Sequence, residues 1–189
     1  MRVELIAACD HKGVIGTADG GLPWDLPRDR AHFRRQASGT CMLLGRRTFE
    51  EMHGWFTNQQ PLVLSRDPEY RPIAPGIAVS SLGEALATAR SLHSPRLLVA
   101  GGAAVFAAAF PLADRLIITH IDVDWQQQCN DAPAPRDSAS GDLPRFPDID
   151  PCQWRRVRRQ HFPTDADHPW PLDFCWYQRE AHPDLPDSS

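Results

Sequence analysis

The sequence Arg96-Leu97-Leu98-Val99-Ala100-Gly101-Gly102-Ala103-Ala104-Val105-Phe106 joins two apolar runs through a pair of glycines. The first run predicts a buried β-strand, and the residues after the glycines predict a helix. In this arrangement the backbone can approach a pyrophosphate closely, and the N-terminus of the helix can face it. The glycines do not have the G-x-G-x-x-G spacing, so a simple tight turn remains the alternative interpretation.

Strands and helices alternate on both sides of this segment. The clearest helix is predicted for Ser81–Leu92, where Ser81 and Glu84 form a capping box ahead of an apolar face. This alternation favours an α/β fold with a mostly parallel central sheet and flanking helices. The strands that the apolar runs predict are Val3–Cys9, Thr40–Leu44, Pro61–Ser65, Ile77–Ser80, Leu97–Ala100 and Leu116–Ile121.

The pattern changes after Ile121. Residues Trp125–Ser140 are polar, have neither helical nor strand periodicity, and are predicted to form an inserted, exposed loop. Trp154–Phe162 and Asp173–Glu180 flank a turn rich in proline and aspartate, and they predict a C-terminal antiparallel hairpin at the sheet edge. We expect one domain over residues 1–181, followed by a disordered tail over 182–189.

The composition excludes several classes of partner. The chain has 189 residues and a formal net charge of −4, with 20 basic and 24 acidic residues, so nucleic acid and anionic membranes are not expected to bind. No run approaches the roughly 18 apolar residues of a spanning helix. The five cysteines are odd in number and contain no C-x-x-C pair, which favours free thiols and a cytoplasmic protein. We expect a monomer.

One group of residues has the chemistry, but not the spacing, of a metal site. His161, Asp165, Asp167 and His168 lie close together in a stretch that also contains proline. Their separation matches none of the standard ligand patterns. We therefore expect a solvated hairpin loop here, and no metal.

An acid and an aromatic residue come together in Leu22-Pro23-Trp24-Asp25-Leu26-Pro27-Arg28-Asp29. Pro27 suits the first position of a helix, which puts Asp29 in the first turn and Phe33 on the same face. A carboxylate beside Trp24 and Phe33 would suit a flat, protonatable heterocycle, because the acid can pair with ring N–H donors while the rings stack. The alternative is a helix-terminal charge that is solvated at the surface.

Two more strands end in residues that suit phosphate groups. One ends in Gly45-Arg46-Arg47-Thr48 and the other in Leu64-Ser65-Arg66. Ligands of open α/β sheets bind at the carboxyl ends of the strands. Three arginines exceed what a diphosphate needs, so they indicate NADPH rather than NADH. Unrelated surface cations are the alternative interpretation.

Taken together, these segments resemble the dihydrofolate reductase family, in the same order along nearly the whole chain. The resemblance implies NADPH-dependent hydride transfer to C6 of 7,8-dihydrofolate, with a proton delivered to N5. The matching motifs are Leu5-Ile6-Ala7-Ala8, Val14-Ile15-Gly16, Leu22-Pro23-Trp24 with Asp29 and Phe33, Gly45-Arg46-Arg47-Thr48, Leu64-Ser65-Arg66, Gly101-Gly102, Thr119-His120-Ile121, and Gly141-Asp142 with Phe146-Pro147.

The resemblance also implies roles for individual residues. Asp29, Trp24 and Thr119 would be catalytic, with Thr119 orienting the carboxylate by a hydrogen bond, and residues 16–22 would form a mobile lid. A cis peptide is implied between Gly101 and Gly102. The implied substrate-binding residues are Ile6, Ala7, Ala8, Phe33, Met52, Gln59 and Ala100; the implied cofactor-binding residues are Ala8, Ile15, Gly16, Gly45, Arg46, Arg47, Thr48, Leu64, Ser65, Arg66, Gly101, Gly102, Ala103, Ala104, Val105 and Phe106.

The sequence departs from the family at one substrate position. The family carries an arginine for the glutamate carboxylate of folate where this chain has Gln59. Glutamine cannot form a bidentate ion pair, so binding of the tail should weaken unless Arg34, Arg35 or Arg71 compensates. Two alternatives therefore stay open: a reductase of another pterin or of a riboflavin-pathway pyrimidine, and a ligand-binding module without catalysis.

Overall fold

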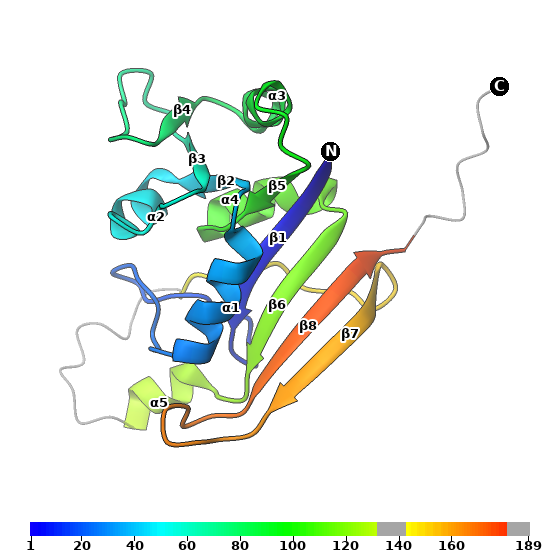
Figure 1. Ribbon diagram of the computed structural model, residues 1–189. Helices are drawn as coiled ribbons and strands as arrows, with labels where there is room; N and C mark the ends of the chain where they lie inside the picture. The colour runs from blue at the N-terminus through cyan, green and yellow to red at the C-terminus, as the bar shows by residue number, and fades with distance from the viewer. Residues whose placement is uncertain (132–142, 181–189) are drawn as a thin grey trace.

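The computed structural model describes residues 1–131 and 143–180. Its strands are β1 Arg2–Cys9, β2 Cys41–Gly45, β3 Gln60–Leu64, β4 Ile77–Val79, β5 Arg96–Val99, β6 Arg115–Ile121, β7 Trp154–Phe162 and β8 Leu172–Arg179. They form one eight-stranded sheet in the order β4-β3-β2-β5-β1-β6-β8-β7 (Figure 1). Neighbours from β4 to β6 run parallel, whereas β8 is antiparallel to β6 and β7. The predicted mostly parallel sheet and C-terminal hairpin are confirmed.

The helices cover both faces of the parallel part of the sheet. They are α1 Pro27–Ala37, α2 Arg46–Glu51, α3 Leu82–Ser91, α4 Ala103–Ala109 and α5 Trp125–Asp131, and a 3-10 turn at Phe110–Leu112 follows α4. In β2, Cys41 and Leu43 pack on the side of α3 and α4, while Met42 and Leu44 pack on the side of α1 and α2. Because both faces are buried, β2 is a continuous apolar run rather than an alternating one.

Helix α3 begins as the sequence predicts, with one difference at its cap. The Ser81 hydroxyl accepts a hydrogen bond of 3.1 Å from the backbone N–H of Glu84. The Glu84 carboxylate, however, accepts bonds of 2.7 Å from the backbone and hydroxyl of Ser80, and not from the N–H of Ser81. The predicted bond from the Glu84 N–H to Ser81 is therefore present. The reciprocal bond to the Glu84 carboxylate comes from the N–H of Ser80 instead of Ser81.

The prediction of a loop over Trp125–Ser140 is wrong for its first part, because residues 125–131 form α5. Asp124 caps this helix by accepting a 3.1 Å hydrogen bond from the N–H of Gln127. The buried carboxylate of Asp10 accepts another, of 3.0 Å, from the N–H of Trp125. Residues 132–140, the Gly141-Asp142 motif and the predicted tail at 182–189 lie outside the described residues.

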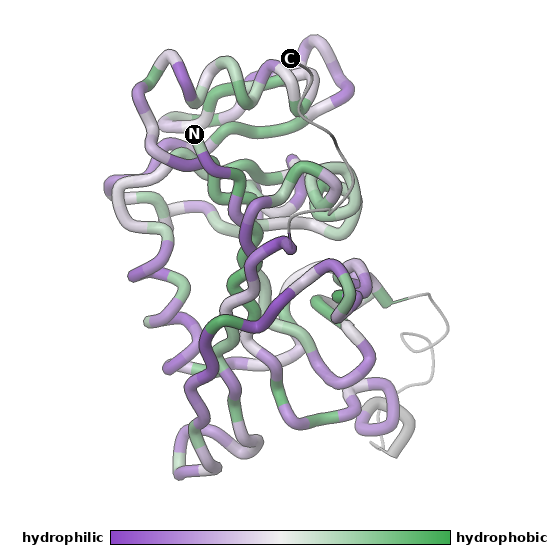
Figure 2. The backbone as a smooth tube through the Cα atoms, turned by 90° about the vertical axis from the view of Figure 1, so that its right-hand side faces the viewer, coloured by the Kyte–Doolittle hydropathy of each residue, from purple (hydrophilic) through white to green (hydrophobic). Residues whose placement is uncertain are grey.

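Hydrophobic segments gather in the middle of the molecule and hydrophilic segments lie at its periphery (Figure 2). The outer strand β7 lies largely in solvent, since seven consecutive residues after Trp154 are exposed. None of the helices in the described ranges is both long and apolar enough to cross a membrane.

Candidate active site

Asp29 lies in the first turn of α1, which begins at Pro27 as predicted. Proline suits this position because it has no N–H to leave unpaired, and the helix dipole favours an acid in the first turn. The Asp29 side chain is buried, and the hydroxyl of Thr119 on β6 donates a 2.6 Å hydrogen bond to its Oδ1. This bond confirms the predicted pairing and excludes a helix-terminal charge in free solvent.

Burial raises the pKa of Asp29 to about 6, and the hydrogen bond from Thr119 opposes the rise. Desolvation penalises a charged carboxylate, whereas a hydrogen-bond donor stabilises it. Asp29 therefore titrates just below neutral pH. Perturbed carboxyl groups of this kind are typical of functional sites.

The indole of Trp24 is also buried, and its Nε1–H has no acceptor among the described residues. Buried donors normally have a partner, so an unpaired one identifies a position where a ligand or water oxygen would be favourable. Trp24 shares an apolar cluster with Ala8 and packs edge-on against Trp125, with the ring centroids 6.3 Å apart. Trp24 therefore lies at the end of β1, beside Ala8.

Apolar residues of four different segments meet on the α1 side of the sheet. Ile6, Phe33, Met52 and Ala100 belong to one cluster, in which the rings of Phe33 and Trp55 lie 5.0 Å apart. The structure thus brings together most of the predicted substrate-binding residues. Ala7 is different: its side chain packs against the cluster on the opposite face of the sheet, so only its backbone could contribute.

Three glycines converge where β2 and β5 end. The Gly101–Gly102 peptide is cis, as predicted, and Gly101 has a φ of +119°. The N–H of Gly45 donates a 2.8 Å hydrogen bond to the carbonyl of Gly101. A Cβ at Gly45 would lie 3.2 Å from the side chain of Val105, and one at Gly102 would lie 3.4 Å from the hydroxyl of Thr48. A side chain at Gly45 would crowd Val105, so glycine lets the ends of β2 and β5 pack closely against the start of α4.

The residues that follow the glycines lie at the start of α4, which begins at Ala103. Val105 and Phe106 are buried on the α4 face of the sheet, and Ile15 and Leu64 pack against the same cluster. Ala104 is exposed. Val105 and Phe106, which were predicted to bind the cofactor, therefore pack against the glycine turn from inside the protein.

The three arginines at this edge are not equivalent. Arg46 forms a 2.8 Å ion pair with Glu50 and stacks on the ring of Tyr70 at 4.5 Å, so its guanidinium already has partners. Arg47 and Arg66 are exposed and form no ion pair with any residue in the described ranges. They are therefore better placed than Arg46 to hold a phosphate.

The predicted lid begins at a fixed point and ends in a tight turn. The N–H of Ile15 donates a 2.9 Å hydrogen bond to the carbonyl of Pro144. A Cβ at Gly16 would lie 2.9 Å from the carbonyl of Gly21 and 3.2 Å from Pro144, so only glycine fits without a shift. Thr17 donates its hydroxyl to the carbonyl of Gly20 and closes the turn.

Gln59 is buried, but its side-chain oxygen is already used. It accepts hydrogen bonds of 2.9 Å from the N–H of Thr57 and 3.3 Å from the N–H of Asn58. Only the amide nitrogen of Gln59 could reach another group. Arg34 lies over the ring of Trp55 at 5.4 Å, next to the apolar cluster, and Arg71 donates to the carbonyls of Pro68 and Tyr70.

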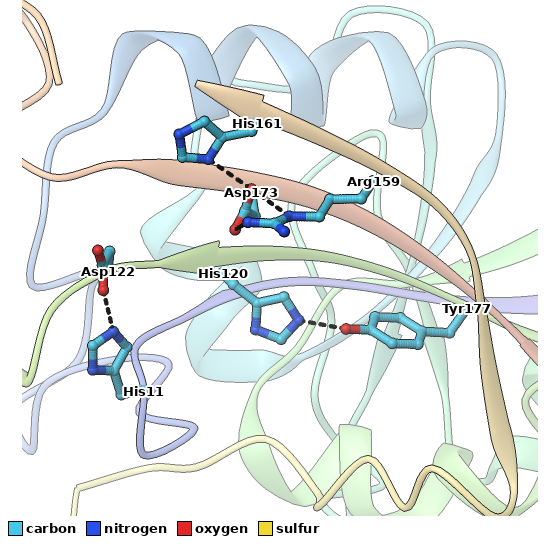
Figure 3. Close-up of polar contacts among 7 residues, drawn as sticks. All are labelled: His11, His120, Asp122, Arg159, His161, Asp173 and Tyr177. Atoms are coloured by element: carbon cyan, nitrogen blue, oxygen red, sulfur yellow. Dashed lines mark hydrogen bonds and ion pairs between the residues drawn. The ribbon is translucent and has the colours of Figure 1, made fainter. Parts of the chain in front are cut away.

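His120, the neighbour of Thr119, takes no part in the Asp29 pair. Successive residues of a strand face opposite sides of a sheet. The Nε2 of His120 lies 2.8 Å from the hydroxyl of Tyr177 (Figure 3). Its Nδ1 lies 3.7 Å from Cys9 Sγ. Burial lowers the pKa of His120. The Thr119-His120-Ile121 motif therefore presents its threonine, and not its histidine, to α1.

Sequence reasoning missed two residues that hold the site in place. Asp10 ties the start of the lid to α5, since its carboxylate also accepts 2.8 Å hydrogen bonds from the N–H groups of Lys12 and Val14. An aspartate ahead of a turn is a local signal for the first of these bonds. The expected solvated hairpin loop is exposed at Asp165 and Asp167, but His168 within it is buried and accepts a bond from the N–H of Arg28.

Comparisons with known proteins agree with this geometry. Residues 2–179 match the model of a family described as dihydrofolate reductase. The chain is 32% identical to the type 3 dihydrofolate reductase of Salmonella typhimurium over 95% of its own length and 99% of that protein. It is 37% identical to the dihydrofolate reductase of Mycobacterium tuberculosis, over 70% of this chain and 80% of that one.

A solved structure is similar over the same range. Dihydrofolate reductase from Enterococcus faecalis, complexed with NADP(H) and RAB-propyl, superposes with a TM-score of 0.77 at 29% identity, covering 95% of this chain and 97% of that one. The family model spans the sheet, the Asp29–Thr119 pair and the glycine turn. The chain belongs to the dihydrofolate reductase family.

Proposed function

We propose that this protein catalyses the reduction of 7,8-dihydrofolate to 5,6,7,8-tetrahydrofolate by NADPH. A hydride is transferred to C6 of the pterin and a proton to N5, so one proton is consumed from solution for each NADPH oxidised. The single observation that carries the proposal is the buried Asp29–Thr119 hydrogen bond of 2.6 Å, placed beside the apolar cluster and close to the end of β1. Membership of the dihydrofolate reductase family supports the choice of substrate.

In this proposal Asp29 binds the pterin and favours its protonation. An ionised carboxylate would accept charge-assisted hydrogen bonds from the amino and ring N–H groups of the pterin. Its negative charge would also favour the protonated ring, which lowers the barrier for hydride transfer to the neighbouring carbon. Thr119 would hold the carboxylate in the orientation that both effects require.

The proton itself is better delivered by water than by Asp29. The Asp29 carboxyl is engaged with Thr119, while the Nε1–H of Trp24 has no acceptor among the described residues. A water that accepts from Trp24 could be polarised by the nearby acid and donate to N5. Trp24 would then orient the donor, and Asp29 would raise the basicity of N5.

NADPH would be held at the edge formed by the ends of β2, β3 and β5. Bound there, NADPH supplies the hydride. Gly45, Gly101 and Gly102 meet there through backbone contacts and carry no side chains, which would let a pyrophosphate approach the backbone. Arg47 and Arg66 would pair with the phosphates, and Thr48 and Ser65 would donate hydroxyl groups.

A second candidate function follows from Gln59. Its oxygen is held by the backbone of Thr57 and Asn58, so it offers little to the carboxylate of a glutamate tail. We therefore keep the alternative that the same site reduces another pterin, one without that tail. The family match, together with an acid and two aromatic residues (Asp29, Trp24 and Phe33) close in sequence, favours dihydrofolate over a riboflavin-pathway pyrimidine.

The test is an absorbance assay of NADPH oxidation with dihydrofolate, with a tail-less dihydropterin, and with neither. We expect rapid oxidation with dihydrofolate and slower oxidation when NADH replaces NADPH. Equal kcat/KM for dihydrofolate and the tail-less pterin would favour the second candidate. Tight binding of both ligands without turnover would instead leave a ligand-binding module without catalysis.

Three further properties are proposed with this function. Residues 1–181 would form one domain, the protein would be a monomer, and it would act in the cytoplasm. The thiols of Cys9, Cys41, Cys152 and Cys175 are free, which suits a reducing compartment. Size-exclusion chromatography with light scattering tests the monomer directly.

A further inference from the structure

Helix α1 carries Asp29 but does not cap its own N-terminus. Its N-cap residue is Leu26, which has no side-chain hydrogen bond to offer. The backbone N–H of Arg28 donates instead to the Nε2 of His168, at 3.1 Å. His168 belongs to the loop between β7 and β8 and is 140 residues away in sequence. The first turn of α1 is therefore fixed from outside the helix.

The side chain of His168 is itself held rigidly. Only 4% of the residue is exposed, and its Nδ1 lies 2.5 Å from Asp165 Oδ1. Because Nε2 accepts from Arg28, the ring proton must be on Nδ1 and is donated to Asp165. Asp165 also accepts a 2.8 Å hydrogen bond from the guanidinium of Arg28. These bonds, that from His168 foremost, lower the pKa of Asp165 to about 2.

The same pair of strands positions both contacts of the first turn. Thr119 on β6 pairs directly with Phe174 on β8, and β8 begins at Leu172, only a few residues after His168. The sheet thus determines where Thr119 holds the Asp29 carboxylate and where His168 holds the adjoining backbone. Because Thr119 holds the carboxylate and His168 holds the backbone of the preceding residue, the Asp29 side chain has little freedom to move.

We propose that His168, oriented by Asp165, is a positioning residue for catalysis: through the N–H of Arg28 it fixes the first turn of α1 and so places the carboxylate of Asp29. This inference rests on the proposed function, in which Asp29 binds and polarises the pterin. His168 does not itself contact substrate. Its contribution is geometric, and small displacements of a catalytic group are costly.

The variants distinguish the loss of the hydrogen-bond acceptor at position 168 from a change in side-chain size. His168→Leu removes the acceptor for the Arg28 N–H, whereas His168→Gln can present an oxygen near the former Nε2. Asp165→Asn keeps an oxygen for Nδ1–H and loses the charge that faces Arg28. The matched control is His161→Gln, since His161 lies in the same hairpin, is exposed, and pairs with Asp173 at 3.0 Å rather than with α1 (Figure 3).

We expect His168→Leu to lower kcat by roughly ten- to a hundredfold, as for other displaced catalytic groups. The pH inflection of kcat/KM that reports Asp29 should move to lower pH, because a loosened first turn admits water to the carboxylate. His168→Gln should recover most of the activity, Asp165→Asn should be intermediate, and His161→Gln should behave as wild type. The Kd for NADPH should not change in any of them.

A folded His168→Leu variant with wild-type kcat and an unmoved pH inflection would overturn the proposal. So would an equal loss in kcat and in NADPH affinity, since that pattern indicates general damage. If His168→Leu does not fold, carboxyl carbon NMR of Asp29 in Asp165→Asn decides, with an unchanged titration counting against the role. The NMR titration needs no turnover, so an inactive wild type would refute the proposed function without affecting this test.

Discussion

At the scale of single residues, Asp29 shows how function opposes stability. Its pKa is about 6 in the folded protein, above the ordinary value of 3.8 that applies to the unfolded chain. Between these two pH values the folded state binds more protons, so stability falls as pH rises through this window. Above it, the folded protein carries the full cost of a buried carboxylate.

Asp29→Asn is therefore expected to be less active and more stable at neutral pH. The neutral amide avoids the desolvation cost, which is at most about 3 kcal/mol from the difference between the two pKa values. Turnover should fall by at least about a hundredfold, as when a preorganised electrostatic group is removed. Urea unfolding near pH 7 and near pH 4 measures the first effect, and the gain should shrink at the lower pH. A gain that is the same at both pH values contradicts the assigned cause.

His32 should give the opposite pH dependence. It is buried between Phe174, on which it stacks at 4.1 Å, and Trp176, and its Nε2 has no partner among the described residues. Burial, with Arg35 and Arg158 nearby, lowers its pKa to about 4. The unfolded chain binds the proton more readily, so stability is full above the ordinary pKa of 6.5 and is lost as pH falls through about 4.

His32→Leu should thus weaken the acid sensitivity of the fold. Removing the unpaired nitrogen should also stabilise the protein by roughly 1 kcal/mol at neutral pH. Thermal unfolding across the range from pH 4 to pH 7 measures both effects. An acid limb identical to that of wild type would show that another group dominates.

At the scale of helices and strands, the sequence predicts the elements whose ends are determined by residues close by in the chain. The strands are correct to within a residue or two, and α3 begins at its serine cap because that cap is three residues from its partner. Helix α5 has a comparable local cap in Asp124, which the prediction of a loop overlooked, and it receives a second, non-local hydrogen bond from Asp10, 115 residues away. The cap of α1 by His168 is equally non-local. The Asp29–Thr119 pair was predictable from the resemblance, but Asp10 and His168, which bind the backbone around it, were not.

Asp10 offers a test at this scale. Replacing it with alanine leaves the N–H groups of Lys12, Val14 and Trp125 without their acceptor, which should cost about 2–4 kcal/mol of unfolding free energy. The start of the lid would loosen with it. Asp122→Ala is the matched control, because Asp122 pairs with His11 at the exposed surface nearby (Figure 3).

The control should change the free energy of unfolding by no more than about 0.5 kcal/mol, as is usual for exposed pairs. Urea unfolding of both variants gives the comparison. If Asp10→Ala were as stable as Asp122→Ala, the buried carboxylate would not be holding the turn and α5 together. Hydrogen exchange at Val14 and Trp125 would then show protection unchanged from wild type.

At the scale of the whole molecule, the sheet ends in β7, whose outer edge is unpaired among the described residues. Open edges invite pairing with another chain, and charged residues discourage it. Four arginines lie on β7, at 155, 156, 158 and 159, and the register shifts between Arg156 and Arg158. The positive charges and the register shift both disfavour pairing of this edge with another chain, so they support the proposed monomer.

Replacing Arg156 and Arg158 by valine tests whether this edge keeps the protein monomeric. The change makes the stretch around the exposed Val157 continuous and apolar, so we expect concentration-dependent self-association in sedimentation velocity. Arg90→Val on the exposed side of α3 removes a charge far from the edge and should remain monomeric. Arg158 also stacks on Trp176 at 4.5 Å, so Arg156→Val alone is included to separate edge charge from lost packing. If the double variant sediments as wild type does, the arginines are not what prevents edge pairing.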